Sequence, residues 1–181
     1  MYGMIHQALR DMALRDLGEA EWEALLRQSG QDAPLFIGME YYADEVTMGL
    51  MHLLARRLDR PIDEFLRGFG GMWIDFAGSS AYGRILDMAG DDFVSFLDSL
   101  DRMHSSIRSN MPRADMPSFE VLEADDTAIE LLYRSSRSGL APFVHGILSA
   151  AAERFGETVV IRHRPDGDAV RFSITRAGAH E

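Results

Sequence analysis

The spacing of the apolar residues changes near Pro112, and this change constrains the fold more than any other feature of the 181-residue sequence. Before Pro112, apolar residues recur three and four positions apart, as in Ile5, Ala8, Leu9 and Met12, which is the pattern of an amphipathic helix. After Pro112, short runs alternate between apolar and polar residues, which is the pattern of half-buried strands. The sequence therefore predicts an α+β protein, with an N-terminal helical lobe and a C-terminal lobe of helices on a four-stranded antiparallel sheet.

The expected elements follow from these patterns and from their boundary residues. Helices are predicted over residues 2–16, around Trp22 and ending near Gly30, from a capping Asp44 to about Leu58, from Pro61 onward, over 91–109 and over 140–155. One β-hairpin is predicted on either side of residues 123–126, and a second pairs residues 159–163 with 170–174 around the turn 165–168.

Two adjacent glycines, Gly70 and Gly71, interrupt the helical pattern that follows Pro61. Glycine inside a helix lowers its stability, so a pair of glycines indicates that something must approach the backbone closely. Either a flat ligand or a tightly packed second helix meets that requirement.

The segment Tyr133-Arg134-Ser135-Ser136-Arg137 repeats strong polar side chains at a spacing of two. In extended backbone, alternate residues point to one face, so Tyr133, Ser135 and Arg137 are expected to converge on one partner. A guanidinium group and two hydroxyl groups are donors suited to an anion, so the predicted partner carries a carboxylate or a phosphate.

His104 lies on the apolar face of the helix predicted over residues 91–109. A core-facing imidazole needs a partner for its ring nitrogens. That partner is either an ordinary hydrogen-bonding group or a metal such as haem iron, for which histidine is a common axial ligand. The residues around His104 leave both possibilities open.

The composition excludes several classes of protein. A net charge of −11 argues against nucleic acid or an anionic membrane as a partner, and the absence of cysteine excludes disulfides and thiol chemistry. No apolar run is long enough to span a membrane, and charged residues throughout 1–17 argue against a signal peptide, so we expect a cytoplasmic location. The sequence contains no zinc-site pair, nucleophile elbow, phosphate loop or paired catalytic carboxylates, so we do not expect an enzyme.

Tyr133-x-Ser135-x-Arg137, preceded by His104, resembles the haem nitric oxide/oxygen binding (H-NOX) family, the sensor module also found in soluble guanylate cyclase. The resemblance covers nearly the whole chain, because it includes the segments 1–3, 69–73 and 116–119. It implies a single domain over residues 1–181, with lobes 1–60 and 61–181 and a haem b buried between them.

The resemblance also implies roles for individual residues. His104 would be the proximal iron ligand, and Tyr133, Ser135 and Arg137 would bind the haem propionates. Pro117 would press on the haem and distort it. The distal side would be lined by apolar residues from three helices: Ile5, Leu9, Trp73, Phe143 and Ile147.

The distal residues predict which gas binds. Members of the family that hold oxygen carry a distal tyrosine at the position of Phe143, which has no hydroxyl group to donate. We therefore expect ferrous haem that binds nitric oxide and carbon monoxide and excludes oxygen. One alternative is an oxygen sensor in which the Trp73 indole donates to the ligand. Another is a haem-free module that binds an apolar carboxylate through Arg137. A haem peroxidase would need a distal acid and base, and the predicted distal set contains neither.

The expected output is a two-state change in the protein. Nitric oxide is expected to release His104 and relax the haem against Pro117. The sequence ends at Glu181 without an output domain, so we expect the signal to pass to a separate protein. Similarity to stand-alone bacterial members implies a sensor histidine kinase or a cyclic-di-GMP enzyme.

Overall fold

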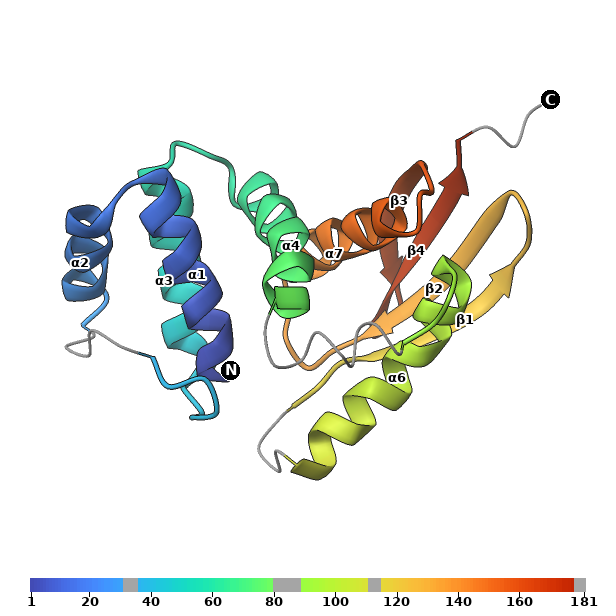
Figure 1. Ribbon diagram of the computed structural model, residues 1–181, viewed down its shortest axis with the longest axis horizontal. Helices are drawn as coiled ribbons and strands as arrows, with labels where there is room; N and C mark the ends of the chain where they lie inside the picture. Colours follow the sequence, from blue (N-terminus) through green and yellow to red (C-terminus); the bar gives the residue numbers. More distant parts are fainter. Residues whose placement is uncertain (31–35, 80–88, 111–114, 178–181) are drawn as a thin grey trace. The chain divides into compact units, whose positions relative to one another are not determined.

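The computed structural model describes residues 1–30, 36–79, 89–110 and 115–177 and has an α+β fold (Figure 1). It divides into two compact units, Met1–Phe69 and Gly70–Glu181. The division falls inside helix α4 (Ile62–Ser79), whereas the sequence analysis placed the limit between the lobes before this helix.

The N-terminal unit is a bundle of α1 (Gly3–Asp16), α2 (Glu19–Gln28) and α3 (Asp44–Arg57), followed by the first part of α4. The three helices pack against one another and bury one apolar stripe each, with Leu9, Leu25 and Leu50 almost completely inaccessible. The helices predicted from the 3.6-residue periodicity are therefore confirmed in this unit.

Asp44 does not cap α3, so this detail of the prediction is wrong. Ala43 occupies the capping position without a side-chain hydrogen bond, and Asp44 is the first helical residue. The Asp44 carboxylate instead accepts a hydrogen bond from the amino group of Met1 at 2.6 Å. This partner lies 43 positions away in the sequence, so the spacing of residues around Asp44 carries no sign of it.

The C-terminal unit contains the sheet and the helices that cover it. The strands β1 (Ser118–Ala124), β2 (Ala128–Arg134), β3 (Val159–Asp166) and β4 (Ala169–Arg176) pair antiparallel in the order β1-β2-β4-β3. Both predicted hairpins are confirmed. Helices α6 (Phe93–Asn110) and α7 (Ala141–Arg154) share one core with the buried sheet residues, and this core includes Phe93, Phe96, Leu97, Ile129, Leu131, Leu148, Phe172 and Ile174.

Helix α4 meets α7 at Gly70, which is buried. A Cβ atom on Gly70 would lie 2.0 Å from the carbonyl oxygen of Phe143 and 3.0 Å from the backbone nitrogen of Ile147. A Cβ atom on Gly71 would find nothing closer than the Gly146 carbonyl oxygen at 4.0 Å. The close backbone approach predicted from the glycine pair is confirmed, and the group that approaches is a helix.

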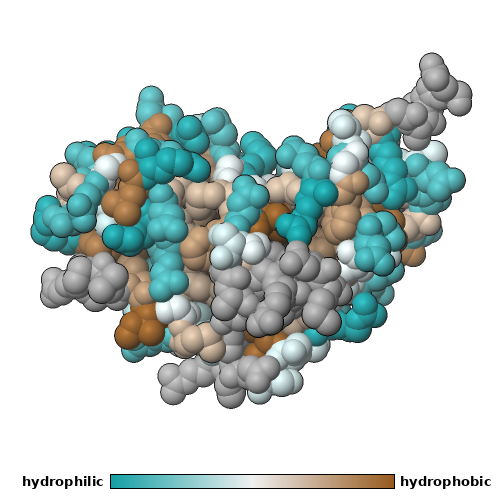
Figure 2. Space-filling model, in the orientation of Figure 1, coloured by the Kyte–Doolittle hydropathy of each residue, from teal (hydrophilic) through white to brown (hydrophobic). Residues whose placement is uncertain are grey.

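The surface of the described residues is mainly hydrophilic over the face seen in Figure 2, in keeping with the high content of charged residues. Within the described ranges, no helix is both long enough and apolar enough to cross a membrane.

Candidate functional site

His104 lies near the end of α6, one turn after Leu100, which is in the hydrophobic core. Its ring centroid is 5.5 Å from that of Phe119, at the start of β1. The Asp101 carboxylate on the same helix accepts a hydrogen bond from the Phe119 backbone N–H at 2.8 Å, and so fixes α6 to β1 beside His104.

The environment of His104 keeps its imidazole neutral. Burial lowers the pKa of His104 from 6.5 to about 4, although the Pro117 backbone and the Asp101 carboxylate both act in the opposite direction. Proline has no N–H, so the Pro117 group that favours the charged ring is its carbonyl. A neutral imidazole is the form that coordinates a metal.

One ring nitrogen of His104 is left without a hydrogen bond within the described part of the chain. Its Nδ1 atom is buried and lacks a hydrogen-bond partner among the described residues. Burying a polar atom without a partner is unfavourable, so such atoms mark places where a further group belongs. The described residues contain no cluster of three or more His, Asp or Glu side chains able to hold a metal ion by themselves. A single available imidazole instead suits an iron held mainly by a macrocycle.

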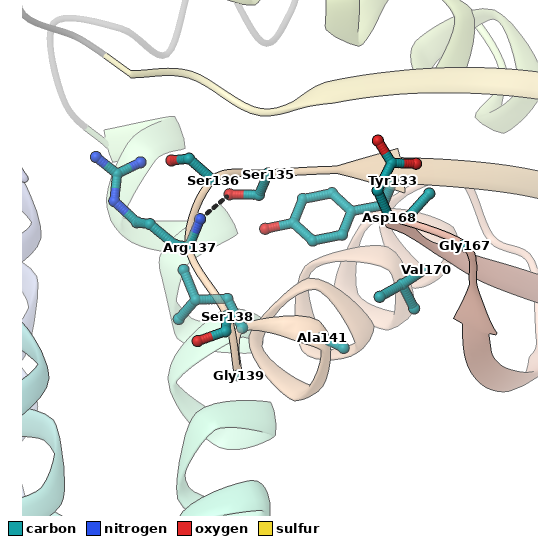
Figure 3. Close-up of a pocket in the computed structure, with 12 residues that line it drawn as sticks. Tyr133, Ser135, Ser136, Arg137, Ser138, Gly139, Ala141, Gly167, Asp168 and Val170 are labelled. Atoms are coloured by element: carbon teal, nitrogen blue, oxygen red, sulfur yellow. Dashed lines mark hydrogen bonds between the residues drawn. The ribbon is translucent and has the colours of Figure 1, made fainter.

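The polar motif over residues 133–137 lies partly in β2 and partly in the loop that follows it. Tyr133 is the second-last residue of β2, and its phenol is buried, which raises the pKa of Tyr133, while a hydrogen bond with Ser135 and the charge of Arg137 lower it. Figure 3 shows the Tyr133 and Ser135 hydroxyls pointing toward the same space. The Arg137 guanidinium extends away on the other side of the loop.

The predicted extended geometry of this motif is wrong beyond Arg134, where β2 ends. The chain turns there, and the Ser135 Oγ accepts a hydrogen bond from the Arg137 backbone N–H at 3.1 Å. The Arg137 Nη1 donates to the carbonyl of Asp115 at 2.5 Å. The three predicted donors are thus close in the fold, but a loop rather than a strand face arranges them.

A pocket of about 280 Å³ lies at this loop. Its walls are Tyr133, Ser135–Ala141 and Gly167–Val170. The volume is at the lower limit of typical small-molecule sites, so it matches the carboxylate-bearing end of a ligand better than a whole porphyrin. Sequence reasoning did not find the residues 167–170. They were recognised only as parts of the second hairpin, whose turn was predicted at 165–168 and whose second strand was predicted from Val170, and the pairing of Tyr133 with Val170 brings that hairpin to the pocket.

The predicted distal residues come from three helices. Phe143 and Ile147 are half-buried on α7, where their backbone contacts Gly70, and Trp73 follows Gly70 by three residues on α4. The Trp73 ring stacks on Phe76, with centroids 5.7 Å apart. The crossing of α4 and α7 therefore brings the segments that carry Trp73, Phe143 and Ile147 together.

The other predicted residues, Pro117, Ile5 and Leu9, belong to other segments of the chain. Pro117 is half-buried just before β1, with its backbone beside His104. Ile5 and Leu9 lie on α1 in the N-terminal unit, where Leu9 is fully buried and Ile5 half-buried. Their distal role stays a prediction.

Comparison with known proteins gives consistent results. The model of the family described as Haem-NO-binding matches residues 2–163. A soluble guanylate cyclase of Caenorhabditis elegans is 32% identical over 168 residues, covering 89% of this chain and 24% of the relative. A soluble guanylate cyclase of Drosophila melanogaster is 24% identical over 155 residues, covering 86% and 23%. The chain thus spans about a quarter of the length of these relatives.

Solved structures share the fold. An H-NOX protein from S. oneidensis in the Fe(II)NO ligation state superposes with a TM-score of 0.88 and 22% identity, covering 98% of this chain and 100% of the other. An Fe(II) unliganded H-NOX protein from K. algicida gives a TM-score of 0.84 and 21% identity, covering 100% and 99%. With the family model matched over most of the sequence and this fold, the chain belongs to the Haem-NO-binding (H-NOX) family of haem-based gas sensors.

Proposed function

We propose that the chain binds haem b and senses nitric oxide, with carbon monoxide as a second ligand, while excluding oxygen. The observation that carries this proposal is the neutral, half-buried imidazole of His104, whose buried Nδ1 atom has no hydrogen-bond partner among the described residues. His104 is the only predicted metal ligand, and one axial imidazole suits haem iron.

Different residues would bind different parts of the haem. His104 would bind the iron, and the Tyr133 and Ser135 hydroxyls with the Arg137 guanidinium would hold the propionates. Pro117 would contact the haem next to His104, because its backbone already lies beside that imidazole. When bound, the haem supplies a coordination position for a diatomic gas.

The choice of gas rests on Phe143. Oxygen bound to ferrous iron accumulates negative charge and is retained where a hydrogen-bond donor reaches it, whereas nitric oxide binds ferrous iron tightly without a donor. The phenylalanine side chain at position 143 has no donor, and this supports nitric oxide and carbon monoxide over oxygen. The indole of Trp73 is the donor that the alternative, an oxygen sensor, would use.

The proposed output begins with release of His104. The hydrogen bond between Asp101 and Phe119 joins α6 to β1, so movement of α6 after release would reach the sheet. We further propose that the domain has no catalytic activity of its own. It would act in the cytoplasm on a separate protein, a sensor histidine kinase or a cyclic-di-GMP enzyme.

The first test is the visible absorption spectrum of the reduced protein, recorded without oxygen, then in air, then with nitric oxide. The proposal expects a haem band that air leaves unchanged and nitric oxide shifts. A spectrum altered by air, with the iron still ferrous, would make this chain an oxygen binder. A colourless protein, purified with sufficient haem supply, would favour the haem-free module that binds an apolar carboxylate through Arg137.

A further inference from the structure

Asp115 joins two segments that the proposed site uses, although no motif marked it in the sequence. It stands two residues before Pro117, in the segment that leads from α6 to β1. Its carboxylate accepts a hydrogen bond from the Ser136 hydroxyl. Its backbone carbonyl accepts one from the Arg137 guanidinium at 2.5 Å. These partners are 21 and 22 positions away in the sequence, so both bonds are tertiary contacts.

The loop that Asp115 contacts also contains a hydrogen bond of its own. Ser135 accepts a hydrogen bond from the Arg137 backbone N–H at 3.1 Å, which sets the local turn. That bond shapes the loop internally but attaches it to nothing outside itself. The Asp115 carboxylate attaches Ser136 to the segment before β1, and the Asp115 backbone carbonyl attaches the Arg137 side chain to the same segment.

Residues 115–117 contact both His104 and the loop that carries Ser136 and Arg137. The Pro117 backbone lies beside the His104 imidazole, and Asp115 holds the loop of Ser136 and Arg137. We propose that Asp115 is a positioning residue, which holds Arg137 in place for a carboxylate ligand and links that loop to the segment beside His104. This inference rests on the proposed haem function for the identity of the carboxylate, but the contacts themselves do not depend on it.

The charge of Asp115 makes the proposal open to a sharp test. If Asp115 acted through charge, its carboxylate near Arg137 would repel an incoming carboxylate, and removing the charge would slow haem loss. If it acts as a hydrogen-bond acceptor, Asp115→Ala should release the loop, while Asp115→Asn should preserve it, because the amide oxygen still accepts from Ser136. Comparing the two variants therefore shows whether Asp115 acts through its hydrogen bond to Ser136 or through its negative charge.

Two measurements on the full chain use these variants. The first is amide hydrogen exchange of residues 135–139 in the haem-free protein, and the second is the rate of haem transfer from the loaded protein to an excess of apomyoglobin. We expect Asp115→Ala to accelerate both by about five- to tenfold, as for the loss of one hydrogen bond, and Asp115→Asn to stay near the unaltered protein. Ser136→Ala should reproduce Asp115→Ala, and combining the two should add little.

The outcomes separate this inference from the proposed function. Unchanged exchange in Asp115→Ala overturns the positioning role, and so does an Asp115→Asn variant that behaves like Asp115→Ala in both measurements. Asp115 is exposed, so these variants are expected to fold, and equal urea midpoints confirm that the comparison is fair. If the unaltered protein takes up no haem, the proposed function fails, while the exchange measurement still decides whether Asp115 positions the loop.

Discussion

Replacing Gly70 by alanine tests the crossing of α4 and α7, on which the proposed distal side depends. The added Cβ would lie 2.0 Å from the Phe143 carbonyl oxygen, whereas ordinary contacts begin near 3.4 Å. The three atoms nearest the new Cβ all belong to the backbone of Phe143 and Ile147. No flexible side chain can move aside, so the helices must separate locally. Such overpacking typically costs about 1–3 kcal/mol.

Gly71→Ala is the matched control, because it adds the same methyl group to the neighbouring position of the same helix. The nearest atom to that Cβ is 4.0 Å away, and alanine in a helix interior is more stable than glycine by about 0.5–1 kcal/mol. Gly70→Ala gains the same helix preference, so this gain cancels and the two variants should differ by the overpacking cost of about 1–3 kcal/mol in the free energy of unfolding. With a urea dependence of about 2 kcal/mol per molar, their unfolding midpoints should lie about 0.5–1.5 M apart.

The assay is urea unfolding of the haem-free protein, followed by far-UV circular dichroism and by the fluorescence of Trp73 in a Trp22→Phe background. Agreement between the two signals checks that the transition is cooperative. Midpoints that coincide for Gly70→Ala and Gly71→Ala would refute the close approach of α7 to Gly70. The placement of Phe143 and Ile147 beside α4 would then lose its support.

Three further predictions concern single side chains. His104→Gly should lose haem unless imidazole is added, because the axial ligand is missing; haem retained with an unaltered spectrum would refute the assignment of His104 as ligand. Phe143→Tyr should raise the affinity of the ferrous protein for oxygen about tenfold or more, through one hydrogen bond to a partly charged ligand, and oxygen titration that shows no gain would contradict the role of position 143. His6 is buried against Phe36 and hydrogen-bonded to Thr47 at 3.1 Å, and burial lowers its pKa to about 4. The unfolded chain therefore binds a proton at His6 near pH 6.5 and the folded chain only near pH 4, so the protein should lose stability as the pH falls through this window. The loss from pH 7 to pH 5 should be smaller by about 2 kcal/mol in His6→Phe, measured by urea unfolding, and an equal loss in both proteins would contradict the neutral state of the buried His6.

Much of the architecture was predictable from neighbouring residues. Helix and strand periodicity depends on positions within a few residues of one another, so the helices of both units and the two hairpins follow from the pattern of apolar residues. The glycine pair 70–71 likewise indicated a close approach, and the apolar face of α6 placed His104 toward the core. The H-NOX resemblance supplied the roles that these patterns leave open.

Other features required the tertiary structure. The sequence shows that Gly70 needs a close neighbour, but only the crossing with α7 identifies it as the backbone of Phe143. Asp44 meets the amino group of Met1 instead of capping its helix. The loop after β2 turns away from the extended geometry that the spacing of Tyr133 and Ser135 predicts.

The contacts of Asp115 show why some features could be predicted from the sequence and others could not. The sequence by itself determined which segments are helices and strands and which residues are candidates for the site, because those properties depend on local spacing and residue type. The attachment of Asp115 to Ser136 and Arg137, and the pairing of β2 with β4 that brings residues 167–170 to the pocket, join positions more than twenty residues apart. Such contacts arise only when packing of the whole core sets the distance between the segments, so only the tertiary structure decided them.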